Sequence, residues 1–124
     1  MSESIFLSMA KAIQYLGDAA SAQQLLATLE RTLEIEVPQI SSALESKNFE
    51  MLQKILHQLK GFAPVFCSDR LVSDITHTES LCKHIDTLAL QATALGASTQ
   101  LLTDLKRLLL EVKVQLQQAA SASK

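Results

Sequence analysis

The feature that most constrains the fold of this chain is the spacing of its apolar residues, which recur every three or four positions over long stretches. The longest such stretch covers residues 19–46, and the spacing is typical of an amphipathic helix. The two-residue alternation that indicates half-buried strands is missing. The chain also has only 3 glycines and 2 prolines among 124 residues, so turn-forming residues are scarce. We therefore expect an all-α fold.

The same periodicity divides the chain into helical segments. We expect a short first helix and then four longer ones, over residues 3–15, 19–46, 49–66, 69–86 and about 99–118.

Three local features qualify these boundaries. Residues 87–98 are ambiguous, because they include Gly96 although apolar residues continue the seven-residue register of the last helix through them. Pro38 lies inside the second helix and is expected to kink it. Residues 119–124 are small and polar, and we expect them to fray.

The turns between these helices are short, and short turns make neighbouring helices antiparallel. We therefore expect an antiparallel, up-down four-helix bundle formed by residues 18–118, with a short extra N-terminal helix within about residues 1–17. A chain of 124 residues has the size of one domain. The sequence thus predicts a single domain that covers the whole chain.

Composition excludes several classes of function. A net charge of −2 does not favour binding to nucleic acid or to anionic lipid. No apolar run has the length of a membrane span, and no basic region precedes the short apolar stretch at the N-terminus. Two cysteines, Cys67 and Cys82, are too few for a disulfide scaffold, and we expect both to be packed thiols. We expect a cytoplasmic protein.

One histidine is predicted to lie on the surface of the helix over residues 49–66. On a helical wheel that starts at Leu52, the apolar stripe stays within about 60° of zero, whereas His57 lies at about 140°. Lys60 and Gly61 follow His57 by about one helical turn. Glycine inside a helix costs about 1 kcal/mol relative to alanine, so access for another molecule is one reason to find it there. A chance grouping of surface residues is the other explanation.

The local sequence favours the first explanation. The string from His57 to Ala63, His-Gln-Leu-Lys-Gly-Phe-Ala, matches His-x-Leu-Lys-Gly-x-Ala at every specified position. This is the motif of histidine-phosphotransfer domains, which the chain resembles over most of its length. In both, a long helix with a proline near its end precedes a polar turn and the motif helix. The chain resembles the phosphotransfer domain of a bacterial hybrid sensor histidine kinase, or a free-standing member of that family.

The resemblance implies a phosphorelay function. His57 would accept a phosphoryl group from an aspartate of a receiver domain and pass it to an aspartate of another response regulator. Lys60 would stabilise the phosphoryl charge, and Gly61 would leave room for the receiver. In the family, an acidic or amide residue about 22 positions after the histidine orients the imidazole, and here that residue is Glu79. Alternatively, Glu79 lies on a solvated face.

The resemblance also implies what the chain does not hold. It has no ATP-binding segment, so it would be a phosphoryl carrier without kinase activity of its own. No cofactor is expected on this chain, because the Mg²⁺ that such a transfer needs would lie on the receiver's carboxylates. We expect a monomer whose partners are receiver domains.

The chain departs from the family pattern near the motif. Cys67 occupies a position where a glycine is usual, and Pro64 lies inside the motif helix. Phe62 and Val65 are larger than the usual residues, which would place them at the edge of the docking surface. A helical docking module that binds a receiver without accepting phosphate is therefore an alternative.

The remaining histidines do not indicate a metal site. His77 and His84 are seven residues apart, with Cys82 between them. Zinc ligands on one helix are usually three or four residues apart, so we expect no metal here.

Overall fold

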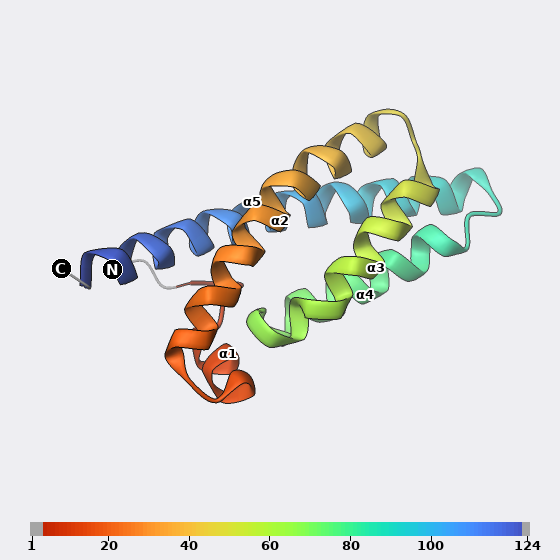
Figure 1. The fold of residues 1–124 in the computed structure, drawn as a ribbon. Coiled ribbons are helices and arrows are strands. Elements are labelled where there is room, and N and C mark those ends of the chain that lie inside the picture. Colours follow the sequence, from red (N-terminus) through yellow and green to blue (C-terminus); the bar gives the residue numbers. More distant parts are fainter. Residues whose placement is uncertain (1–3, 123–124) are drawn as a thin grey trace.

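The computed structural model describes the backbone of residues 4–122 and the side chains of residues 4–118. This part of the chain is helical, in agreement with the all-α prediction (Figure 1). The helices are α1 (Met9–Leu16), α2 (Ala19–Glu45), α3 (Phe49–Phe66), α4 (Asp69–Lys83) and α5 (Leu88–Ala122).

The boundaries of α2 and α3 agree with the prediction to within one residue, because local capping residues define where they begin. The Asp18 carboxylate accepts a hydrogen bond from the Ser21 amide at 2.7 Å. The Asn48 side chain does the same for the Met51 amide at 3.1 Å. Each side chain satisfies one of the amides that a helix start leaves unpaired. Pro38 is exposed inside α2 and does not end it.

The N-terminal segment differs from the prediction. A helix was predicted over residues 3–15, but α1 begins at Met9. Residues 1–3 lie outside the described part of the chain. The residues just before α1 form what we call the N-terminal strap, residues 5–8, which is not helical.

The N-terminal strap is held by groups that are distant in sequence. Phe6 and Leu7 are buried, and their amides donate hydrogen bonds of 2.9 and 3.0 Å to the Glu111 carboxylate on α5. The Ser68 amide, in the turn after α3, donates to the Phe6 carbonyl at 2.8 Å. These partners satisfy backbone groups that would otherwise be paired within a helix, so the strap is stable in an extended form.

The second half of the chain corrects two boundaries. Helix α4 ends at Lys83, three residues earlier than predicted, because the backbone leaves the helical region at His84. Helix α5 begins at Leu88, so residues 88–98 of the ambiguous stretch are helical and Gly96 is one of the exposed residues of α5.

The tail that was predicted to fray starts inside α5. The backbone of α5 is helical through Ala122, which includes the first four residues of that tail. Ser123 and Lys124, which belong to the predicted tail, lie outside the described residues.

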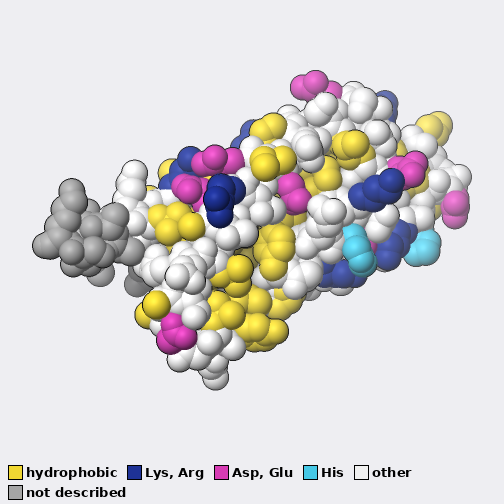
Figure 2. Space-filling view, viewed as in Figure 1, with side chains coloured by type: hydrophobic (Ala, Val, Ile, Leu, Met, Phe, Trp, Pro, Cys, Tyr) yellow, Lys and Arg dark blue, Asp and Glu magenta, His cyan; other side chains and the backbone are white. Residues whose placement is uncertain are grey.

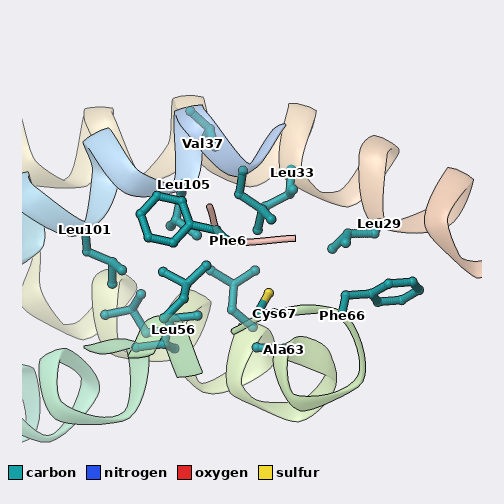
Figure 3. Packing of buried hydrophobic residues seen from close by; sticks show 14 of the residues in the cluster. Phe6, Leu29, Leu33, Val37, Leu56, Ala63, Phe66, Cys67, Leu101 and Leu105 are labelled. Atoms are coloured by element: carbon teal, nitrogen blue, oxygen red, sulfur yellow. The ribbon is translucent and has the colours of Figure 1, made fainter. Parts of the chain in front are cut away.

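The helices pack in two pairs. The strongest contacts join α3 to α4 and α2 to α5, and further contacts join α4 to α5 and α2 to α3. Figure 3 shows Phe6 inserted between these pairs, close to Leu33 and Leu105. One cluster of buried apolar residues includes members of the N-terminal strap and of all five helices. Among the described residues, no helix combines the length and the apolar character that crossing a bilayer requires.

Candidate functional site

The candidate site lies where α3 packs against α4. Gln53, His57 and Lys60 are separated by four and three residues, so they share one face of α3. Glu79 comes from α4, where it lies four residues after the core residue Ile75. The side chain of Glu79 is only 2% exposed. The contact between the two helices therefore brings a buried carboxylate beside the predicted histidine.

The Glu79 carboxylate contacts polar groups from both helices. Its Oε2 atom lies 2.9 Å from Nδ1 of His57 and accepts a hydrogen bond of 3.0 Å from Nε2 of Gln53. Its Oε1 atom accepts a hydrogen bond of 2.7 Å from Nζ of Lys60. The ammonium of Lys83, one turn further along α4, lies 3.5 Å from Oε2. The alternative that Glu79 lies on a solvated face was wrong.

These partners keep Glu79 ionised. Burial raises the pKa of Glu79, but the hydrogen bonds from Lys60, Gln53 and His57 and the charge of Lys60 outweigh it and lower the pKa to about 2. The cover over the carboxylate consists largely of side chains that are themselves partly exposed: His57 is 63% exposed and Lys83 is 46% exposed. Glu79 is thus a fixed negative charge under a layer of polar side chains.

An ionised carboxylate determines which ring nitrogen of His57 carries the proton. Because the carboxylate can only accept a hydrogen bond, Nδ1 of the neutral ring must donate to Oε2 of Glu79. The lone pair of the neutral ring is then on Nε2. The helical wheel predicted an exposed side chain for His57, and the exposure of the ring confirms this. The site thus offers a nucleophilic nitrogen on the surface of the protein.

The ammonium of Lys60 already has a partner within the site. The family resemblance implied a contact with the phosphoryl group, whereas Nζ of Lys60 here donates to Glu79. The side chain is 34% exposed. A lysine ammonium has three N–H donors on a flexible stem, so Lys60 can bind a second anion while it stays near Glu79.

Gly61 lies on the exposed surface of α3 next to Lys60. A Cβ atom built on Gly61 would meet no atom of the described structure within 4 Å. Nothing in the described part of the chain therefore requires a glycine there. Pro64, one turn further, is also exposed, and its presence does not end α3.

The residues expected at the edge of a docking surface divide into two groups. Val65 is 9% exposed and belongs to the core, so it cannot form such an edge. Phe62 is half-buried and lines an apolar depression of about 80 Å³ between α2 and α3, together with Leu25 and Phe66. Figure 2 shows histidines and Lys or Arg side chains gathered over α3 and α4, and hydrophobic side chains over α1 and the adjoining ends of α2 and α3.

Two members of the site, Gln53 and Lys83, were missed in the sequence. Each was detectable in principle, because Gln53 precedes His57 by four residues and Lys83 follows Glu79 by four residues. Residues at this spacing are neighbours on a helix surface. What the sequence did not reveal is that α3 packs against α4 so that Gln53 and Lys83 both approach the carboxylate of Glu79.

The other candidate residues lie apart from this network. Cys67 and Cys82 are free and buried, in agreement with the prediction of packed thiols. Burial raises the pKa of Cys67 to about 12, which suppresses its reactivity. His77 and His84 are exposed, and the residues with described side chains contain no group of three or more His, Cys, Asp or Glu that could hold a metal ion.

The chain was compared with family models, with curated proteins and with solved structures, and none of them matches it.

Proposed function

We propose that this protein is a phosphoryl carrier of the histidine-phosphotransfer type. Nε2 of His57 attacks the phosphorus of an aspartyl phosphate on a receiver domain. The N–P bond forms as the P–O bond breaks, and the aspartate leaves as a carboxylate. In the reverse reaction, the phosphohistidine passes the group to an aspartate of another response regulator.

The observation that supports this proposal best is the contact between Nδ1 of His57 and the buried Glu79 carboxylate. A carboxylate at Nδ1 leaves Nε2 with its lone pair, and it stabilises the positive charge that the ring gains when Nε2 bonds to phosphorus. Lys60 and Lys83 supply positive charge near the incoming phosphoryl oxygens. The exposed surface at Gly61 lets a second protein approach the ring closely.

The proposal includes the finer fold expected for this family. Short connections join consecutive helices from α2 to α5, and each of these helices packs against the next. Helix α2 also packs against α5. This pattern favours an antiparallel, up-down four-helix bundle to which α1 adds a short extra helix.

The partners in this proposal are receiver domains of response regulators. The carrier acts as a monomer in the cytoplasm and holds no cofactor, and the Mg²⁺ for the transfer is bound by the receiver. The apolar depression that Phe62 lines between α2 and α3 adds hydrophobic surface, which suits docking of another protein.

The reaction is best tested first without a partner, with phosphoramidate as a small phosphoryl donor. Attack by Nε2 of His57 would break the P–N bond of the donor and release ammonia. We expect one acid-labile, base-stable phosphoryl group per chain. His57→Ala should abolish this uptake and leave the helical circular dichroism unchanged, because Gln53 and Lys60 still donate to the Glu79 carboxylate when the ring is removed. His77→Ala and His84→Ala, which remove the other exposed histidines, serve as matched controls and should retain it.

The second arm uses receiver domains that carry radiolabelled aspartyl phosphate. We expect the label to move to the wild-type chain and not to His57→Ala. Label on His57→Ala, or no uptake from any donor by the wild type, would contradict the proposal. Tight binding of a receiver without transfer would instead support a docking module that does not accept phosphate.

A further inference from the structure

One oxygen of the candidate site has two donors from the same helix. Oε2 of Glu79 lies 3.0 Å from the amide nitrogen of Gln53 and 2.9 Å from Nδ1 of His57. Gln53 lies one turn before His57 on α3, so a single helix face presents both donors to the carboxylate. The Gln53 side chain is half-buried at the contact with α4.

The carboxylate needs such a constraint because other groups compete for it. Lys60 holds Oε1 at 2.7 Å, and Lys83 approaches Oε2 at 3.5 Å. The terminal torsion of a glutamate has no sharp preference, so movement of either flexible lysine can rotate the carboxylate away from the ring. A phosphoryl group on His57 would attract both ammonium groups and increase this competition.

The chemistry of the glutamine amide suits it to this position. Its N–H group donates to Oε2 at every pH at which the protein is folded, because the amide does not titrate. It also adds no positive charge beside the imidazole, as a lysine at the same place would. A neutral donor can therefore fix the carboxylate without opposing the positive charge that the ring gains in the reaction.

We infer that Gln53 is a positioning residue for His57, which holds Oε2 of Glu79 against Nδ1–H and so keeps Nε2 unprotonated and directed outward. The effect on phosphoryl uptake depends on the function proposed above. The effect on the protonation state of the ring does not, and this allows the two to be tested separately.

The test compares Gln53→Leu and Gln53→Asn with the wild type. Leucine keeps much of the size of the side chain but removes the donor, and asparagine keeps the amide but is one methylene too short to reach. Gln58→Leu, an exposed glutamine beside His57, is the matched control. The ¹⁵N chemical shifts of the His57 ring, measured at a pH where the ring is neutral, report which nitrogen carries the proton.

We expect the wild type and Gln58→Leu to carry the proton almost entirely on Nδ1. Both Gln53 variants should increase the share on Nε2 by about three- to tenfold, the effect of losing one hydrogen bond of about 0.7–1.4 kcal/mol. Uptake from phosphoramidate should fall only in proportion to the share of the ring that keeps its proton on Nδ1. Circular dichroism and thermal unfolding confirm that each variant is folded.

Unchanged ring shifts in both folded Gln53 variants would overturn the inference, as would an equal change in Gln58→Leu. If the wild type takes up no phosphoryl group, the proposed function fails, but the ring shifts still decide the role of Gln53. A change in uptake without a change in the ring would also contradict a positioning role.

Discussion

At the scale of single residues, the site depends on one carboxylate that receives contacts of different kinds. His57 and Lys60 approach opposite oxygens of Glu79: His57 approaches Oε2 and Lys60 donates to Oε1. The two contacts therefore have separate consequences. The contact at Oε2 determines the protonation of the imidazole ring, whereas Lys60 keeps Glu79 ionised and brings a positive charge to the surface near the ring.

This separation predicts different defects for Lys60→Met and Glu79→Gln. In Lys60→Met, the ¹⁵N shifts of the His57 ring should stay as in the wild type, while phosphoryl uptake slows about tenfold or more, since a charge-assisted contact of about 1.5–3 kcal/mol is lost. In Glu79→Gln, the ring should lose its preference for a proton on Nδ1, because an amide can either donate or accept. Lys54→Met, an exposed lysine on the same helix, is the control. Equal ring shifts in the two variants would contradict the assignment.

At the scale of helices, two exposed glycines allow a docking surface on α3 to be compared with an ordinary solvent-exposed surface on α5. Gly61 on α3 and Gly96 on α5 are both exposed, and at neither would a Cβ meet any described atom within 4 Å. Both glycines therefore have free space for a side chain within the described structure. Only Gly61 lies near the proposed nucleophile His57, so substitutions at Gly96 serve as controls for the same substitutions at Gly61.

We predict that Gly61→Ala and Gly96→Ala each stabilise the protein by up to about 1 kcal/mol, because alanine is the better helix former and has free space at both positions. Larger side chains should separate the two sites. Gly61→Leu should block transfer from a phosphorylated receiver and spare uptake from phosphoramidate, which needs little room. Gly96→Leu should affect neither reaction. Transfer from a receiver at the wild-type rate in Gly61→Leu would show that this glycine has no role in access.

At the scale of the whole molecule, two buried carboxylates, Glu111 and Glu36, differ in whether distant parts of the chain supply them with hydrogen-bond donors. Burial raises the pKa of Glu111, but hydrogen bonds from the N-terminal strap and from Arg107 outweigh it, so that the pKa is lowered. Glu36 on α2 is 8% exposed, and within the described part of the chain its Oε2 atom has no hydrogen-bond partner. Burial therefore raises the pKa of Glu36 to about 7.

These opposite shifts predict opposite effects on the pH dependence of stability. Glu111 is a stronger acid in the folded state, so its contribution is full above its ordinary pKa of 4.5 and is lost as the pH falls below that value. Glu36 is a weaker acid in the folded state, so its contribution is lost as the pH rises from 4.5 to about 7. Relative to the wild type, Glu36→Gln should therefore gain stability between pH 5 and pH 8.

Urea unfolding at pH 3, 5 and 8 measures both effects as differences from the wild type. Glu111→Ala should cost about 1–3 kcal/mol at pH 8, because it leaves amides of the strap unpaired, and it should cost less at pH 3. Glu45→Ala, which removes an exposed carboxylate, should change stability by no more than about 0.5 kcal/mol. A Glu36→Gln difference that stays constant from pH 5 to pH 8 would contradict the assigned shift.

The sequence alone determined the features that depend on short-range interactions. The bounds of α3 were predicted to the residue, since the apolar period lies within the segment and the Asn48 cap directly precedes it. The exposure of His57 followed from helical geometry, because the apolar stripe of α3 can face only one way.

Only the tertiary structure decided the features whose partners are distant in the chain. The apolar spacing before Met9 fits a helix equally well, and the extended strap exists because Glu111, more than a hundred residues away, accepts its amides. The burial of Glu79 likewise has no local signal. The side chain of Glu79 lies on the core-facing side of α4, where its charge loses contact with water. Three polar side chains of α3 compensate for this loss by hydrogen bonding to the carboxylate.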